Sequence, residues 1–143
     1  MLAYARLRGF SKDDYLNPEH PVQVSIRKTV AEFLDMEPDE MPLGIDGCSA
    51  PVYGVPMVKM AHGVAKLADP INFSPERQKA CQTITSAMMA YPFMVAGTGQ
   101  LDTDLMIVGG GKLFSKGGAE GYQIIGVPPG VLAEGSQGLG IAI

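Results

Sequence analysis

A carboxylate and a thiol stand two residues apart in segment 43–52, which reads LGIDGCSAPV. We expect a strand over residues 43–48, which would point Asp46 and Cys48 to the same side. Gly47 between them lets the backbone come close to a ligand. The pair could therefore hold a metal ion or a polar substrate. The alternative is a turn aspartate and a buried cysteine where an ordinary strand ends.

Two further segments contain residues suited to a ligand cleft. Residues 97–103 read GTGQLDT, and residues 112–121 read KLFSKGGAEG. In the second segment Lys116 follows a predicted short strand and precedes two glycines, so its amine can point into a cleft beside a sheet edge. Taken alone, a Lys-Gly-Gly motif favours a solvated hairpin lysine.

In this order, the blocks IDGC, GTG, DT and KGGAEG resemble those of the L-asparaginase II family of the thermolabile, rhizobial type. The similarity runs from residues 17–23, NPEHPVQ, to residues 138–142, GLGIA. The chain departs from the family pattern at three positions: Ser49 replaces glycine, Phe93 an acidic residue and Gln100 arginine. These departures concern substrate affinity more than ancestry.

The resemblance implies an amidohydrolase that converts the side-chain amide of L-asparagine to aspartate and ammonia. It implies a fold like that of serine β-lactamases and penicillin-binding proteins, with helices packed on an antiparallel sheet that is incomplete here. Lys116 would be catalytic and would polarise a serine nucleophile. Cys48 and Asp46 would contribute to a metal position, with zinc as the expected ion. The implied substrate-binding residues are Asp46, Thr98, Asp102 and Thr103. A homodimer is the expected assembly.

A Ser-x-x-Lys pattern at Ser25 to Lys28 is of the kind in which a lysine activates a serine one helical turn away. We expect both residues on the polar side of an amphipathic helix, where a solvated lysine keeps its charge and cannot act as a base. This pair is therefore not expected to be catalytic.

The chain opens inside a helical pattern and closes inside a strand pattern. We therefore expect a fragment whose serine, with a Cys-Ser-Gly-Lys-His block, belongs to a missing N-terminal part, and the fragment alone to be inactive. The alternatives are a catalytically inert fragment or interaction domain, or a related glutaminase.

The elements that must position these residues follow from hydrophobic periodicity and capping signals. Helices are predicted from Pro21, from Pro56 and from Ser74-Pro75-Glu76 to a stop at Pro92, and Asp102 is expected to cap a short helix through Val108. The apolar stripe of the first comprises Val22, Ile26, Val30, Phe33 and Leu34, and that of the second Met57, Met60, Ala61, Val64 and Leu67. Strands are predicted over 113–115, 122–127 and 139–143. Helices followed by an antiparallel meander indicate a single α+β domain over residues 1–143.

Composition limits the classes of partner. The 143 residues carry a net charge of −4 with no basic cluster, which argues against nucleic acid and anionic membranes as partners. No leader and no apolar run near the about 18 residues of a membrane span are found, so we expect a cytoplasmic protein. The two cysteines, Cys48 and Cys81, occur in different contexts, and no disulfide is expected.

Overall fold

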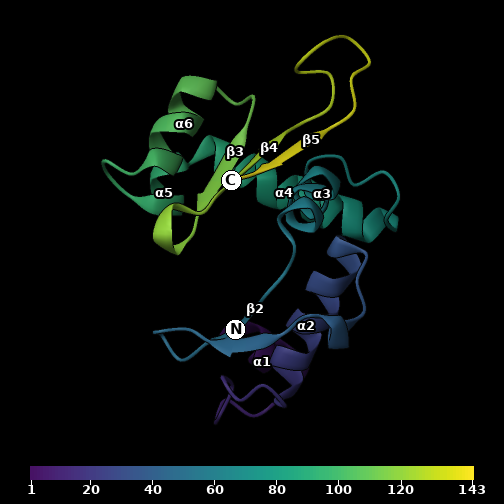
Figure 1. Ribbon diagram of the computed structural model, residues 1–143, viewed down its shortest axis with the longest axis vertical. Helices are drawn as coiled ribbons and strands as arrows, with labels where there is room; N and C mark the ends of the chain where they lie inside the picture. Colours follow the sequence, from purple (N-terminus) through teal and green to yellow (C-terminus); the bar gives the residue numbers. More distant parts are fainter. The chain divides into compact units, whose positions relative to one another are not determined.

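The computed structural model describes residues 1–143 as two compact units, Met1–Pro56 and Met57–Ile143 (Figure 1). Both units contain helices and an antiparallel sheet, which confirms the predicted α+β class. The single domain and the β-lactamase-like arrangement stay predictions. None of the helices combines the length and the apolar character that crossing a membrane requires.

The first unit begins with two helices whose ends follow from sequence. Its elements are α1 (Leu2–Arg8), α2 (Pro21–Leu34), the 3-10 turn η1 (Pro38–Glu40), β1 (Leu43–Ile45) and β2 (Pro51–Tyr53). Pro21 suits the first turn of α2 because proline has no N–H to leave unpaired. His20 caps this helix, since its Nδ1 accepts a hydrogen bond from the Val22 N–H at 3.2 Å. Of the predicted stripe, Val22 and Leu34 are buried, while Ile26, Val30 and Phe33 are half-buried.

The hairpin β1–β2 corrects the strand predicted over residues 43–48. β1 ends at Ile45, which pairs with Pro51, and the chain reverses between them. The Ser49 N–H donates to the Asp46 carbonyl at 2.8 Å, and the Asp46 N–H donates to the Ala50 carbonyl at 2.9 Å. Ser49 adopts a left-handed φ of 67°. Turn-forming Asp, Gly and Ser residues ended the strand before its alternation could continue.

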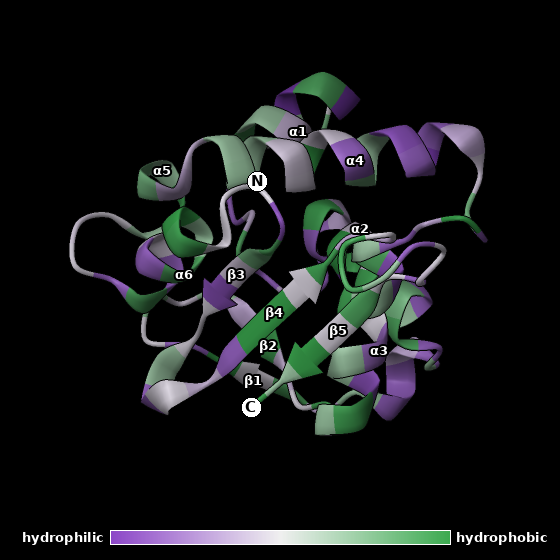
Figure 2. Ribbon diagram, turned by 90° about the horizontal axis from the view of Figure 1, so that it is seen from above, coloured by the Kyte–Doolittle hydropathy of each residue, from purple (hydrophilic) through white to green (hydrophobic).

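The second unit places helices against a three-stranded sheet. Its elements are α3 (Met57–Ala68), α4 (Pro75–Ala90), α5 (Pro92–Ala96), α6 (Leu101–Gly109), β3 (Phe114–Gly117), the 3-10 turn η2 (Ala119–Gly121), β4 (Gln123–Val127) and β5 (Leu139–Ala142). The strands form an antiparallel meander in the order β3-β4-β5, as predicted. The central strand β4 is mostly apolar in Figure 2, in keeping with its place in the middle of the sheet.

The core of the second unit joins α3, α6 and β3. Its buried members are Val64, Ala68, Met106 and Phe114. Helix α3 lies directly on the backbone of β5, since a methyl group added at Gly140 would overlap the Ala61 carbonyl oxygen. Met60 packs against this core as predicted, whereas Met57, in the first turn of α3, is 46% exposed.

A size-matched pair fixes how β3 and β4 align. Phe114 is 1% exposed and pairs in register with Gly126. A methyl group added at Gly126 would overlap the Phe114 ring. The ring therefore fills the space that the glycine leaves above the central strand.

Helix starts in the second unit follow the predicted signals in one case and depart from them in two. Ser74 caps α4, because its Oγ accepts from the Arg77 N–H at 3.4 Å. Pro92 does more than stop α4, since it also begins the short helix α5. Asp102 is not the cap of α6: Gln100 holds that position, and Asp102 is the second helical residue, with its side chain turned inward.

Candidate functional site

A buried carboxylate lies at the centre of the polar residues in the second unit. Asp102 on α6 is 5% exposed, and its oxygens meet side chains and backbone of β3 and β4. Its Oδ1 accepts hydrogen bonds from Ser115 Oγ at 3.0 Å and from Gln123 Nε2. Its Oδ2 accepts from the Gly117 N–H at 2.7 Å. Three strand residues thus point donors at one carboxylate.

The hydrogen bonds keep the Asp102 carboxylate ionised although it is buried. Burial raises the pKa of Asp102, but the hydrogen bonds from Gly117, Gln123 and Ser115 and the charge of Lys116 together bring the pKa below its ordinary value. A negative charge is therefore fixed behind the end of β3.

Lys116 brings a positive charge beside this carboxylate. Its Nζ lies 3.7 Å from Asp102 Oδ2 and donates to the Gly117 carbonyl at 2.5 Å. The lysine side chain is 51% exposed, against 6% for the aspartate side chain. The ammonium group therefore stands between a buried anion and the surface, where it can meet a ligand.

Gly117 leaves the space that the carboxylate needs. A methyl group added there would lie 3.1 Å from Gln123 Oε1 and 3.3 Å from Asp102 Oδ2. This glycine thus allows the backbone N–H to approach the carboxylate closely, and a side chain would crowd it.

The other two predicted cleft residues differ in exposure. Thr103 is buried, and its hydroxyl donates to the Gly97 carbonyl at 2.7 Å, which ties α6 to the end of α5. Thr98 is exposed in the loop between two glycines of positive φ, Gly97 and Gly99. Their part in substrate binding stays a prediction.

Sequence reasoning missed the two side chains that hold Asp102. Ser115 is fully buried, and Gln123 is 8% exposed and donates to both Asp102 and Ser115 Oγ. The available signal was a polar residue on the inward side of each predicted strand. Such residues need partners, because burying an unpaired polar group is costly.

In the first unit, Asp46 and Cys48 lie close together at the tip of the hairpin. Cys48 Sγ donates to Asp46 Oδ2 at 3.5 Å, and the Gly47 N–H donates to Asp46 Oδ1 at 2.8 Å. Both side chains are exposed. The pair meets as predicted, but through a turn and not through strand alternation.

The two residues do not by themselves make a zinc site. Structural and catalytic zinc sites use three or four protein ligands. No group of three or more histidine, cysteine or acidic residues in the chain is arranged to hold a metal ion. Asp46 and Cys48 supply two donors, and the expected zinc stays a prediction.

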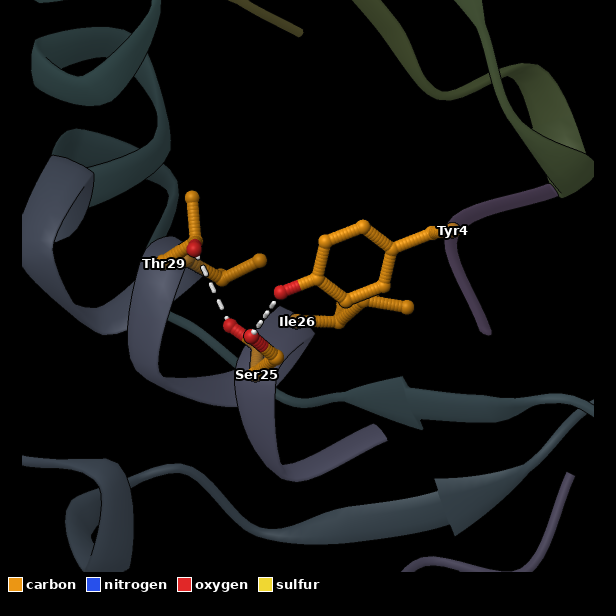
Figure 3. Close-up of a pocket in the computed structure, with 5 residues that line it drawn as sticks. Tyr4, Ser25, Ile26 and Thr29 are labelled. Atoms are coloured by element: carbon orange, nitrogen blue, oxygen red, sulfur yellow. Dashed lines mark hydrogen bonds between the residues drawn. The ribbon is translucent and has the colours of Figure 1, made fainter. Parts of the chain in front are cut away.

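The Ser-x-x-Lys pattern on α2 is not assembled for catalysis. Ser25 Oγ and the Tyr4 hydroxyl share a hydrogen bond of 2.9 Å in a pocket that Ile26 and Thr29 also line (Figure 3). Lys28 is exposed, and no hydrogen bond joins it to Ser25. Ser25 is half-buried beside Tyr4, and the lack of a hydrogen bond to Lys28 supports the exclusion of this pair.

The comparison with known families identifies the chain. The model of the L-asparaginase II family matches residues 1–143, which is the whole chain. No curated protein matches the sequence. The chain therefore belongs to the L-asparaginase II family, as its motifs predicted. The family implies asparagine hydrolysis in general, and with it a hydrolase that acts on a small molecule.

Proposed function

We propose that this chain forms part of an L-asparaginase, and that Lys116 is its catalytic cation. The reaction is hydrolysis of the side-chain amide of L-asparagine to aspartate and ammonia. One observation carries the proposal: in a chain of this family, the Lys116 ammonium is half-exposed and lies 3.7 Å from the buried carboxylate of Asp102. A cation held in this way is suited to stabilise charge that develops on a substrate or nucleophile.

The proposed chemistry is acyl transfer through a serine. The serine oxygen attacks the side-chain carbonyl carbon, the carbon–nitrogen bond breaks, and the nitrogen leaves as ammonia with the serine's proton. Water then hydrolyses the ester and restores the serine. Lys116 polarises the serine, while backbone amides take the negative charge of the tetrahedral intermediate.

We propose that the nucleophilic serine comes from a part of the protein outside residues 1–143. Ser115 is the serine nearest to the Lys116 site, but it is fully buried and hydrogen-bonded to Asp102. Ser25 bonds to Tyr4 and has no bond to Lys28. Neither hydroxyl combines exposure with an adjacent base, which a serine nucleophile needs.

Ammonia release by the protein translated from the whole reading frame tests this function, with asparagine and glutamine compared as substrates. Lys116→Ala should lower the turnover number at least about a hundredfold, the usual scale for a positioned acid–base group. Lys112→Ala is the matched control, because Lys112 lies in the same motif and is exposed. Full activity of Lys116→Ala would show that another residue is catalytic.

An inert domain is the second candidate, because neither Ser25 nor Ser115 combines exposure with an adjacent base. A complete lack of ammonia release from both amides would support this candidate and contradict the enzymatic one. Faster release from glutamine than from asparagine would instead assign the chain to a glutaminase.

A further inference from the structure

The Asp102 carboxylate accepts three hydrogen bonds within the protein, and the Lys116 ammonium lies beside it. A carboxylate offers about four lone-pair positions. Oδ1 takes Ser115 and Gln123, while Oδ2 takes the Gly117 N–H and faces the Lys116 ammonium. A substrate amine could reach this carboxylate only by displacing one of these donors.

We propose that Asp102 is a positioning residue, which holds the Lys116 ammonium and the end of β3 in place, and that it does not contact substrate. This inference rests on the proposed function of Lys116 as the catalytic cation.

The need for such a residue follows from the flexibility of lysine. Its four-carbon side chain can adopt many rotamers, and half of this side chain is exposed. Two anchors limit the ammonium: the Gly117 carbonyl at 2.5 Å and Asp102 Oδ2 at 3.7 Å. Only the second carries a full charge.

Asp102 is itself held rigidly, so it can transmit position to the lysine. Its donors come from β3 and from β4, and Ser115 and Gln123 also bond to each other at 2.5 Å. Proteins fix reactive side chains within a fraction of an ångström by holding the residue that contacts them in a network of buried hydrogen bonds.

Asp104 offers a matched control on the same helix. It lies two residues after Asp102 in the first turn of α6, and its side chain is exposed. Asp104→Asn therefore removes the same charge from the same turn without touching the buried network.

The first test follows the lysine ammonium groups of the 143-residue chain by ¹H–¹⁵N NMR and needs no activity. In the unsubstituted chain the Lys116 ammonium protons should exchange with water more slowly than those of exposed Lys112. Asp102→Asn should speed the exchange at Lys116 at least about threefold, the range for a partly exposed ion pair. Asp104→Asn should leave it unchanged.

Equal exchange at Lys116 and Lys112 in the unsubstituted chain would overturn the proposal, and this comparison does not depend on a variant that folds. An unchanged Lys116 signal in folded Asp102→Asn would overturn it as well.

The second test uses the ammonia assay on the protein from the whole reading frame. Asp102→Asn should lower kcat at least about tenfold and change KM by less than about threefold, because positioning of the cation matters at the transition state. A raised KM with an unchanged kcat would overturn the proposal and make Asp102 a substrate ligand. If the unsubstituted protein releases no ammonia, the proposed function fails, while the NMR comparison still decides whether Asp102 holds Lys116.

Discussion

The hairpin tip and the sheet of the second unit each present an aspartate with polar partners, and the two differ in the source of those partners. Asp46 accepts from Gly47 and Cys48, its two following residues, and stays exposed. Asp102 accepts from residues 13 to 21 positions later in the chain and is buried.

The difference in partners leaves Asp46 able to bind a ligand, whereas Asp102 is fixed in place by the fold. Local partners at the hairpin tip move with the turn and leave Asp46 lone pairs open to water or a ligand. The long-range partners of Asp102 exist only when α6, β3 and β4 are assembled, so their geometry is set by the fold. Residue type alone does not distinguish the two roles.

The largest expected effect is on folding stability. Asp102→Ala should lower the free energy of unfolding by about 3 kcal/mol or more, because it removes the buried acceptor that Ser115, Gln123 and Gly117 share and leaves the Gly117 N–H unpaired. Asp46→Ala at the exposed tip should cost less than about 0.5 kcal/mol. Urea unfolding followed by circular dichroism measures both. Equal losses in the two variants would remove the distinction between the two regions.

The second largest effect is expected on the zinc affinity of the protein from the whole reading frame. If Cys48 is a zinc ligand, Cys48→Ala should weaken zinc binding at least about a hundredfold, since even partners of ligands change affinity about 10- to 100-fold. Zinc determination after dialysis against graded chelator gives the affinity. Cys81→Ala is the control, because that buried cysteine lies in α4. Identical zinc content with and without Cys48 would argue against a metal role for the hairpin tip.

Ionisation of Asp102 should make the free energy of unfolding depend on pH at acidic pH. Its pKa in the folded protein lies below the ordinary value of 3.8, so its ionised form stabilises the fold above about that pH. The stability difference between the unsubstituted chain and Asp102→Asn should stay constant from neutral pH to about 4 and shrink as the pH falls from 3.8 toward the folded-state pKa. Urea midpoints measured across this range provide the test. A gap that widens on acidification would mean that the carboxyl is protonated in the folded chain.

The smallest effect concerns association through the edge of the sheet. β5 pairs only with β4, and Leu139 and Ile143 are 39% and 66% exposed. Unpaired strand groups beside apolar side chains favour association, so the average mass of the 143-residue chain should rise with concentration. Ile143→Lys should reduce this rise a few-fold in light scattering, whereas Val108→Lys on α6 should not. A mass independent of concentration would show that this edge is inert.

The sequence was a good guide to elements whose signals are local. The Ser74-Pro75-Glu76 start of α4 and the three strands of the meander appear near their predicted positions, since capping residues and alternation act over a few residues. The hairpin was missed for the converse reason: an apolar run into Asp46 reads as a longer strand, and only the turn bonds of Asp46 and Ser49 show where it ends.

The candidate site was predicted only in its charged residues. The motifs selected Lys116 and Asp102, and the fold brings these two together. The bonds of Ser115 and Gln123 to Asp102 were not predicted, because they depend on which β4 residue lies opposite which β3 residue. Helical periodicity also could not place Asp102, since a first-turn aspartate is equally compatible with a solvent-facing cap.

The space that Gly126 leaves for the Phe114 ring determines how β3 and β4 align. Phe114 can occupy it only in the present pairing, and a slide of β4 by two residues would bring Ile124 or Pro128 under the ring. The same pairing brings Gln123 opposite Gly117 at the far end of β3. The alignment of the charged site is thus set three residues away, where the Phe114 ring fills the space that Gly126 leaves.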